Sequence, residues 1–131
     1  MPRYFPIDAG VGVDCSESDI LAISWTEERL SADFVLPRTE GRALRIRFNR
    51  ETIVRLLGEL ALSTENDTEK EGTIPRHFAY RVEGSTFAAA QSESWKMVHE
   101  PVHHSRFVTG GGCMDVLSKA EPSFEIIETY E

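Results

Sequence analysis

Apolar and polar residues alternate along three successive stretches of this chain. This period of two is typical of β-strands that rest one face on a core and turn the other to water. An antiparallel register between the first two stretches sets Trp25 opposite Leu30, and one between the second and third sets Asp33 opposite Arg47. The pattern therefore predicts a three-stranded antiparallel meander. Its apolar members are Leu21, Ile23, Trp25, Leu30, Ala32, Phe34, Leu36, Leu44, Ile46 and Phe48.

The segment LRIRFNRETIVRLLGELAL, residues 44–62, predicts a strand that turns directly into a helix. Asn49 stands where an N-cap side chain would accept a hydrogen bond from the first helical turn. From Ile53 onward, apolar residues recur at i, i+3, i+4 and i+7, the spacing of one helix face. We therefore expect a helix over about residues 50–62, packed across one face of the sheet.

The second half of the chain predicts further strands and one more helix. Ser85 is placed to cap a helix over about residues 86–98, although the first residues of this range could instead continue a strand. The glycine triplet at 110–112 predicts a hairpin turn, and residues 123–129 a last strand. The expected fold is α+β: an antiparallel sheet of about six or seven strands with both helices packed on one face.

A chain of 131 residues is expected to form a single domain over 1–131 with a core of its own. Glycine, proline and small polar residues predict an irregular segment over residues 1–18. Residues 63–76 are polar and acidic without a periodic apolar set, which predicts a mobile surface loop.

Charge and cysteine content restrict the function classes. The formal net charge of −8 argues against a nucleic-acid or anionic-membrane binder, because both need a positive field. No apolar stretch is long enough to span a bilayer. Cys15 and Cys113 lie far apart without a secretion signal before them, so we expect reduced thiols in a soluble, cytoplasmic protein.

Catalytic candidates gather around the predicted glycine hairpin. His103 and His104 precede the turn, and Cys113 and Asp115 follow it. Imidazole, thiolate and carboxylate could form a thiol nucleophile site or bind zinc. The spacing matches neither CxxC nor HExxH, so we expect no metal and no cofactor. A small thiol- or metal-dependent hydrolase that uses His103 or His104 with Cys113 and Asp115 is the alternative hypothesis, with His104, Cys113 and Asp115 as the catalytic candidates.

The preferred hypothesis is a non-catalytic module, because no complete catalytic set is evident. It would bind a partner protein or a small acidic ligand, or form a homodimer through a sheet face or edge. Polar and aromatic side chains of the second half could line its binding cleft. The predicted ligand-binding residues are His77, Tyr80, Trp95, His103 and Arg106.

Overall fold

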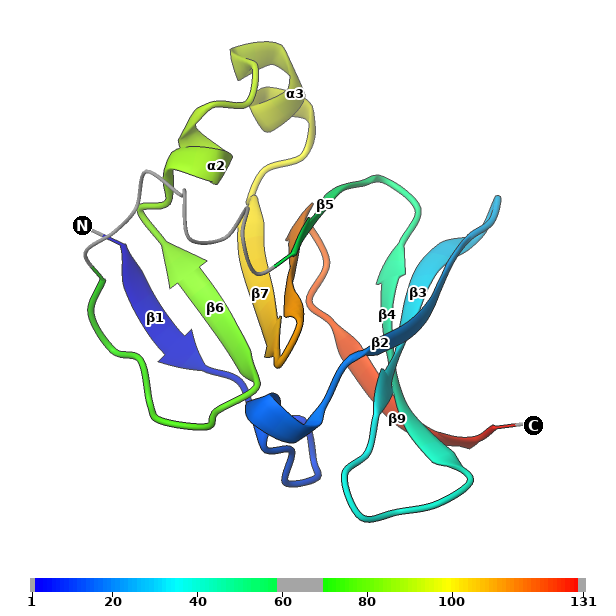
Figure 1. The fold of residues 1–131 in the computed structure, drawn as a ribbon. Coiled ribbons are helices and arrows are strands. Elements are labelled where there is room, and N and C mark those ends of the chain that lie inside the picture. The colour runs from blue at the N-terminus through cyan, green and yellow to red at the C-terminus, as the bar shows by residue number, and fades with distance from the viewer. Residues whose placement is uncertain (1, 59–69, 130–131) are drawn as a thin grey trace.

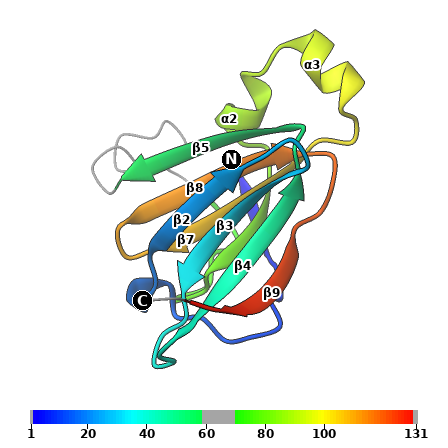
Figure 2. The same cartoon turned by 90° about the vertical axis from the view of Figure 1, so that its right-hand side faces the viewer.

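The computed structural model describes residues 2–58 and 70–129, which form two antiparallel β-sheets packed face to face (Figures 1 and 2). One sheet has the strand order β1-β6-β7-β8-β5, and the other has the order β2-β3-β4-β9. The five-stranded sheet contains β1 (Arg3–Pro6), β6 (Ala79–Glu83), β7 (His103–Thr109), β8 (Gly112–Ser118) and β5 (Thr52–Gly58). The four-stranded sheet contains β2 (Ile20–Trp25), β3 (Arg29–Val35), β4 (Arg42–Asn49) and β9 (Ser123–Glu128). A short 3-10 helix, η1 (Cys15–Glu17), precedes β2.

The predicted meander is confirmed as β2–β3–β4, with Trp25 opposite Leu30 as expected. The register between β3 and β4 differs from the prediction by two residues, because Asp33 lies opposite Arg45 and not opposite Arg47. A shift of two keeps every apolar side chain on the core face, so alternation alone cannot distinguish the two registers. In the observed register Arg45 makes a bidentate pair with Asp33 (2.7 and 2.9 Å).

The predicted helix over 50–62 is wrong, because residues 52–58 form strand β5, paired with β8. The strand carries apolar residues on both faces: Val54 packs on the core between the sheets, and Ile53 and Leu57 lie on the opposite face. A strand that is apolar on both faces reproduces the spacing of an amphipathic helix over a short window. Two consecutive β-branched residues, Ile53 and Val54, favour the strand. The last part of the prediction, 59–62, lies outside the described residues.

The continuous second helix over 86–98 is also wrong. Two short helices stand there, α2 (Thr86–Ala89) and α3 (Glu93–Val98), each with its own serine N-cap. Ser85 caps α2, as predicted, and Ser92 caps α3. The second cap competes with continuation of the first helix. Figure 1 shows α3 projecting away from both sheets, so the α+β class gives way to a two-sheet β-structure with nine strands among the described residues.

The main core lies between the sheets. Its aromatic centre joins Phe34 of β3 to Phe78 and Phe107 of the other layer, with ring centroids 5.0 and 6.0 Å apart. The two inner faces therefore form one apolar interior. The outer face of the five-stranded sheet takes no part in this core and carries a separate set of side chains. Among the described residues no helix has the length and hydropathy needed to cross a membrane. The buried members of this core are Leu30, Ala32, Phe34, Leu36, Leu44, Ile46, Phe48, Phe78, Ala79, Phe107, Met114 and Val116.

Candidate functional site

A buried carboxylate lies at the centre of the outer face of the five-stranded sheet. Asp115 of β8 is fully buried and faces Arg106 on β7 and Arg55 on β5, its register partners in the two neighbouring strands. Arg106 donates to it through Nε (2.7 Å) and Nη2 (3.1 Å), and Arg55 donates through Nε (2.9 Å). The His104 ring nitrogen Nε2 lies 2.7 Å from Asp115 Oδ1. We call these four residues the Asp115 network.

The network continues to residues that are distant in the sequence. Ser85, the N-cap of α2, places Oγ 2.7 Å from His104 Nδ1. Arg106 Nη1 donates to the Tyr4 hydroxyl over 2.6 Å. Sequence reasoning missed Tyr4 as a member and gave Ser85 only a capping role. Both come from outside the hairpin, so no local spacing could indicate them.

Hydrogen bonding outweighs desolvation at the centre of the network. Burial alone would raise the pKa of Asp115, but hydrogen bonds from His104 and Arg106, together with their charges, hold that pKa well below its usual range. Burial alone would lower the pKa of Arg106, but the Asp115 carboxylate raises it above its ordinary value. Burial also raises the pKa of the Tyr4 hydroxyl. The network thus contains charged groups that are stabilised by one another.

The predicted catalytic residues His104, Cys113 and Asp115 lie together on this face, whereas His103 points to the opposite face of β7. The Cys113 thiol is 3.9 Å from Asp115 Oδ2. All three side chains are buried, with at most 3% of each residue exposed. A reactive thiol needs partial exposure and a positive setting, and this one neighbours a carboxylate. No group of three or more His, Cys, Asp or Glu side chains in the described ranges is arranged to hold a metal.

A cleft of about 400 Å³ opens on the inner face of the same sheet. It lies between strands β1, β6 and β7 on one side and the start of β9 on the other. Arg81 lies directly opposite Ser105 in the β6–β7 ladder, and His103 is two residues along β7 on the same face. Within the described parts of the chain, the side chains of Arg81, His103 and Ser105 make no hydrogen bond or ion pair. We call this the Arg81 cleft. Its lining is Phe5, Pro6, Ile7, Asp8, Arg81, His103, Ser105, Glu121, Pro122 and Phe124.

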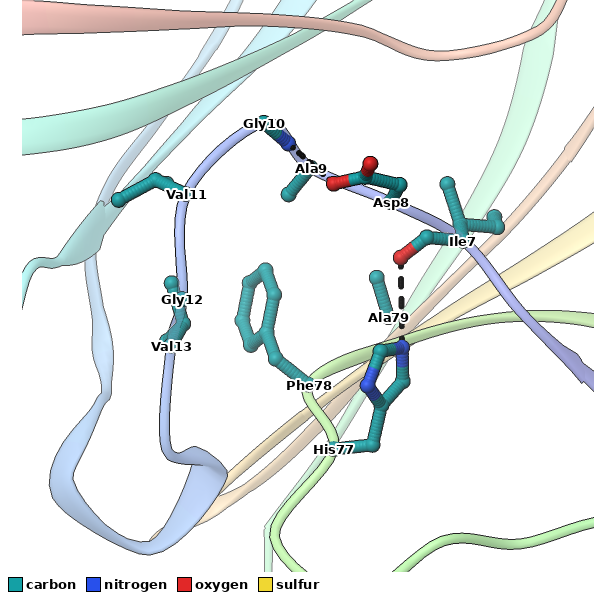
Figure 3. Close-up of a pocket in the computed structure, with 10 residues that line it drawn as sticks. All are labelled: Ile7, Asp8, Ala9, Gly10, Val11, Gly12, Val13, His77, Phe78 and Ala79. Atoms are coloured by element: carbon teal, nitrogen blue, oxygen red, sulfur yellow. Dashed lines mark hydrogen bonds between the residues drawn. The ribbon is translucent and has the colours of Figure 1, made fainter.

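A second hollow, of about 440 Å³, lies beyond the segment that carries Ile7 and Asp8 (Figure 3). His77 places Nε2 3.3 Å from the Ile7 carbonyl oxygen, and Asp8 accepts a hydrogen bond from the Gly10 amide. Figure 3 shows the chain from Ile7 to Val13 arching around the Phe78 ring. Both polar side chains are engaged in holding this arch, so the hollow offers mainly small apolar groups to a ligand.

The five predicted ligand-binding residues do not share one site. His103 lines the Arg81 cleft and His77 lines the neighbouring hollow. Tyr80 and Arg106 are buried on the outer face of the five-stranded sheet. Trp95 lies on α3, where its ring stacks on His99 with centroids 4.6 Å apart. Ser105, a cleft residue that the sequence did not indicate, is recognised only from the β6–β7 register, which sets it opposite Arg81.

Comparisons of this chain with protein-family models, with curated proteins and with solved structures give no match. The function is therefore argued from the geometry of the two sites.

Proposed function

We propose that this protein is a cytoplasmic, non-catalytic binding module that holds a small monocarboxylate in the Arg81 cleft. One observation carries the proposal: three hydrogen-bond donors converge on a cleft of ligand size, and within the described chain none of their side chains has a partner. Buried or half-buried donors are normally satisfied, so an unpaired set at a cleft favours a bound acceptor. Both cysteines are free thiols, which supports a reducing compartment.

The donors suit a carboxylate. Arg81 presents a planar fork that matches two carboxylate oxygens, and the Ser105 hydroxyl and the His103 ring can each add one hydrogen bond. Arg81 and Ser105 are direct neighbours across the ladder, so both can reach the same anionic group. The sheet holds all three residues on strands, which limits the reorganisation needed on binding.

The other lining residues determine which non-polar part and how many negative charges the ligand can have. Phe5 and Phe124 supply apolar walls, which favour a hydrophobic body attached to the anionic group. Asp8 and Glu121 are exposed at the same cleft and repel additional negative charge. A monoanion with an apolar body therefore fits better than a phosphate dianion.

The hydrolase alternative has less support. Its candidate residues His104, Cys113 and Asp115 are buried in the Asp115 network, so a substrate could not reach them without local opening. The cleft itself contains a serine and a histidine, but Ser105 and His103 make no hydrogen bond to each other. Nucleophilic catalysis by serine requires such an activating contact.

The test is a titration of the isotopically labelled full chain with phenylacetate, followed by amide chemical shifts, with the neutral 2-phenylethanol as the control ligand. We expect shifts centred on residues 81, 103 and 105 with phenylacetate and much smaller ones with the alcohol. Arg81→Gln should weaken phenylacetate binding roughly 10- to 100-fold, because charge-assisted hydrogen bonds are lost.

The matched control is Arg42→Gln, because Arg42 is an exposed arginine of the other sheet and does not line the cleft. It should leave the affinity unchanged. The proposal fails if phenylacetate shifts no cleft residue. It also fails if the alcohol binds equally well, or if both arginine variants weaken binding alike.

A further inference from the structure

The four edge strands of the two sheets differ in how they are protected. Natural sheets block unwanted pairing at an edge with charged residues or proline. Among the described strands, three of the four edges carry such residues, and β2, with the sequence ILAISW, carries neither a charge nor a proline. The register irregularity of β2 lies between Ile20 and Ala22, so the stretch from Ile23 to Trp25 is regular. In Figure 2, where the four-stranded sheet faces the viewer, β2 forms one edge and β9 the other. The protecting residues of the other edges are Arg3 and Pro6 in β1, Arg55 in β5, and Glu125 and Glu128 in β9.

The unprotected edge is also apolar and accessible. Leu21, Ile23 and Trp25 are 54%, 37% and 64% exposed. Ile23 and Trp25 border a groove of about 440 Å³ whose other wall is the edge strand of the five-stranded sheet, where Val54 and the exposed Leu56 lie. Exposed apolar groups that gather in this way mark an interaction surface more often than scattered ones do.

The backbone of β2 has unused hydrogen-bonding groups at this edge. The Thr26 amide donates to the Arg29 carbonyl (2.9 Å), which makes residues 26 and 29 a hydrogen-bonded pair at the end of the β2–β3 hairpin. Such pairs alternate along an antiparallel ladder. Ser24 therefore directs its N–H and C=O to β3, and Ile23 and Trp25 direct theirs away from β3, to the open edge.

We propose that β2 is a homodimer interface, at which the β2 strand of a second copy pairs antiparallel around a two-fold axis at Ser24. This register sets Ile23 of each copy opposite Trp25 of the other, so both pairs exchange N–H···O bonds, about four in all. It joins two four-stranded sheets into one continuous sheet and extends the apolar groove across the axis. An aromatic residue opposite a β-branched one is a favourable cross-strand pair.

The occupant is a second copy because the strand is complementary to itself. The small Ser24 meets its own image at the axis, and inner-facing side chains meet inner-facing side chains. Each copy has a formal net charge of −8, which makes most surfaces repel one another. The β2 strand has no charged residue, so two copies can approach there with the least electrostatic cost.

The interface is distinct from the Arg81 cleft, whose lining comes from β1, β6, β7 and the β9 side of the molecule. One pair of edge strands gives an interface at the small end of the specific range, and a dissociation constant in the micromolar range is expected. Carboxylate binding and dimerisation can therefore succeed or fail separately.

The experiment is sedimentation of the full chain from about 1 µM to about 1 mM, a range that brackets a micromolar dissociation constant. We expect a reversible monomer–dimer equilibrium. Ile23→Lys places a charge next to the axis, opposite Trp25 of the second copy, and should weaken dimerisation at least tenfold. Ile126→Lys, at an exposed isoleucine on the β9 edge of the same sheet, should leave it unchanged.

Amide hydrogen exchange of the unmodified protein gives a second readout that does not depend on how the variants fold. Protection of the Ile23 and Trp25 amides should rise with protein concentration, and that of Ser24 should be high throughout. A monomer over the whole range, a dimer that Ile23→Lys leaves intact, equal effects of the two lysine variants, or assembly beyond a dimer would each overturn the proposal. So would concentration-independent exchange at Ile23 and Trp25.

Discussion

Replacement of Asp115 by asparagine should lower stability far more than replacement of Asp33, which also makes a bidentate contact with an arginine. Asn keeps the shape of the side chain but removes the charge that faces Arg55, Arg106 and His104 in a fully buried site. Breaking a buried ion pair by removal of one partner costs about 3–5 kcal/mol. The Asp33 side chain is 18% exposed in its pair with Arg45, and such pairs contribute about 1 kcal/mol or less.

Urea unfolding followed by circular dichroism measures the difference. With an m-value of about 1–3 kcal/mol/M, Asp115→Asn should lower the midpoint by more than about 1 M, and Asp33→Asn by much less. Proteins of this kind have a free energy of unfolding of about 5–15 kcal/mol, so the loss of about 3–5 kcal/mol leaves the Asp115 variant close to unfolding. The reasoning is refuted if Asp115→Asn costs no more free energy of unfolding than Asp33→Asn.

The same substitution should remove part of the acid sensitivity. The pKa of Asp115 is lower in the folded chain than in the unfolded chain, where an aspartate titrates near about 3.9. The carboxylate therefore contributes stability that is fully present above the unfolded pKa and is lost as the pH falls towards the folded pKa. The stability difference between the wild type and Asp115→Asn should thus be constant near neutral pH and shrink below about pH 4. A difference that grows on acidification would contradict this assignment.

Two further predictions concern packing. Gly112→Ala should lower the free energy of unfolding by several kcal/mol, because its φ is +154° and a Cβ would lie 2.0 Å from a backbone carbonyl oxygen of β5. Gly58→Ala, which has open space around it, should leave the free energy of unfolding nearly unchanged. Phe107→Ala should cost about 3–5 kcal/mol, because this ring is fully buried between the sheets, and Ile126→Ala on the surface should cost less than about 0.5 kcal/mol. Urea midpoints check both pairs, and equal costs within either pair would contradict the packing described.

Local patterns predicted the strands that have one buried face. Alternation identified β2, β3 and β4, and the glycine triplet identified the β7–β8 hairpin, because both signals depend only on neighbouring residues. A helix over 50–62 packed on the apolar face of the meander would have placed Leu57 in one interior with Trp25, Phe34 and Ile46, and this is wrong in part. Phe34 and Ile46 are core residues, but Trp25 is exposed at the sheet edge and Leu57 lies on the outer face.

The helix over 50–62 failed for a physical reason that sequence reasoning could not resolve. Arg55 interrupts the apolar residues of β5 on its outer face, which reads as the polar side of a helix. The carboxylate that pairs with Arg55, Asp115, lies 60 residues further along the chain. Without that tertiary partner, a half-buried arginine in the middle of an edge strand is indistinguishable from a solvated one on a helix.

Strand β7 connects the buried network to the proposed binding site. Its alternate residues point to opposite faces of the sheet: His104 and Arg106 belong to the Asp115 network, and His103 and Ser105 line the Arg81 cleft. A slip of one residue would exchange the two sets and turn His104 and Arg106 into the apolar core. The ion pairs to Asp115 make that slip costly, because the arginine and histidine would be buried without their carboxylate. The network thereby specifies the register on which the placement of the cleft donors depends.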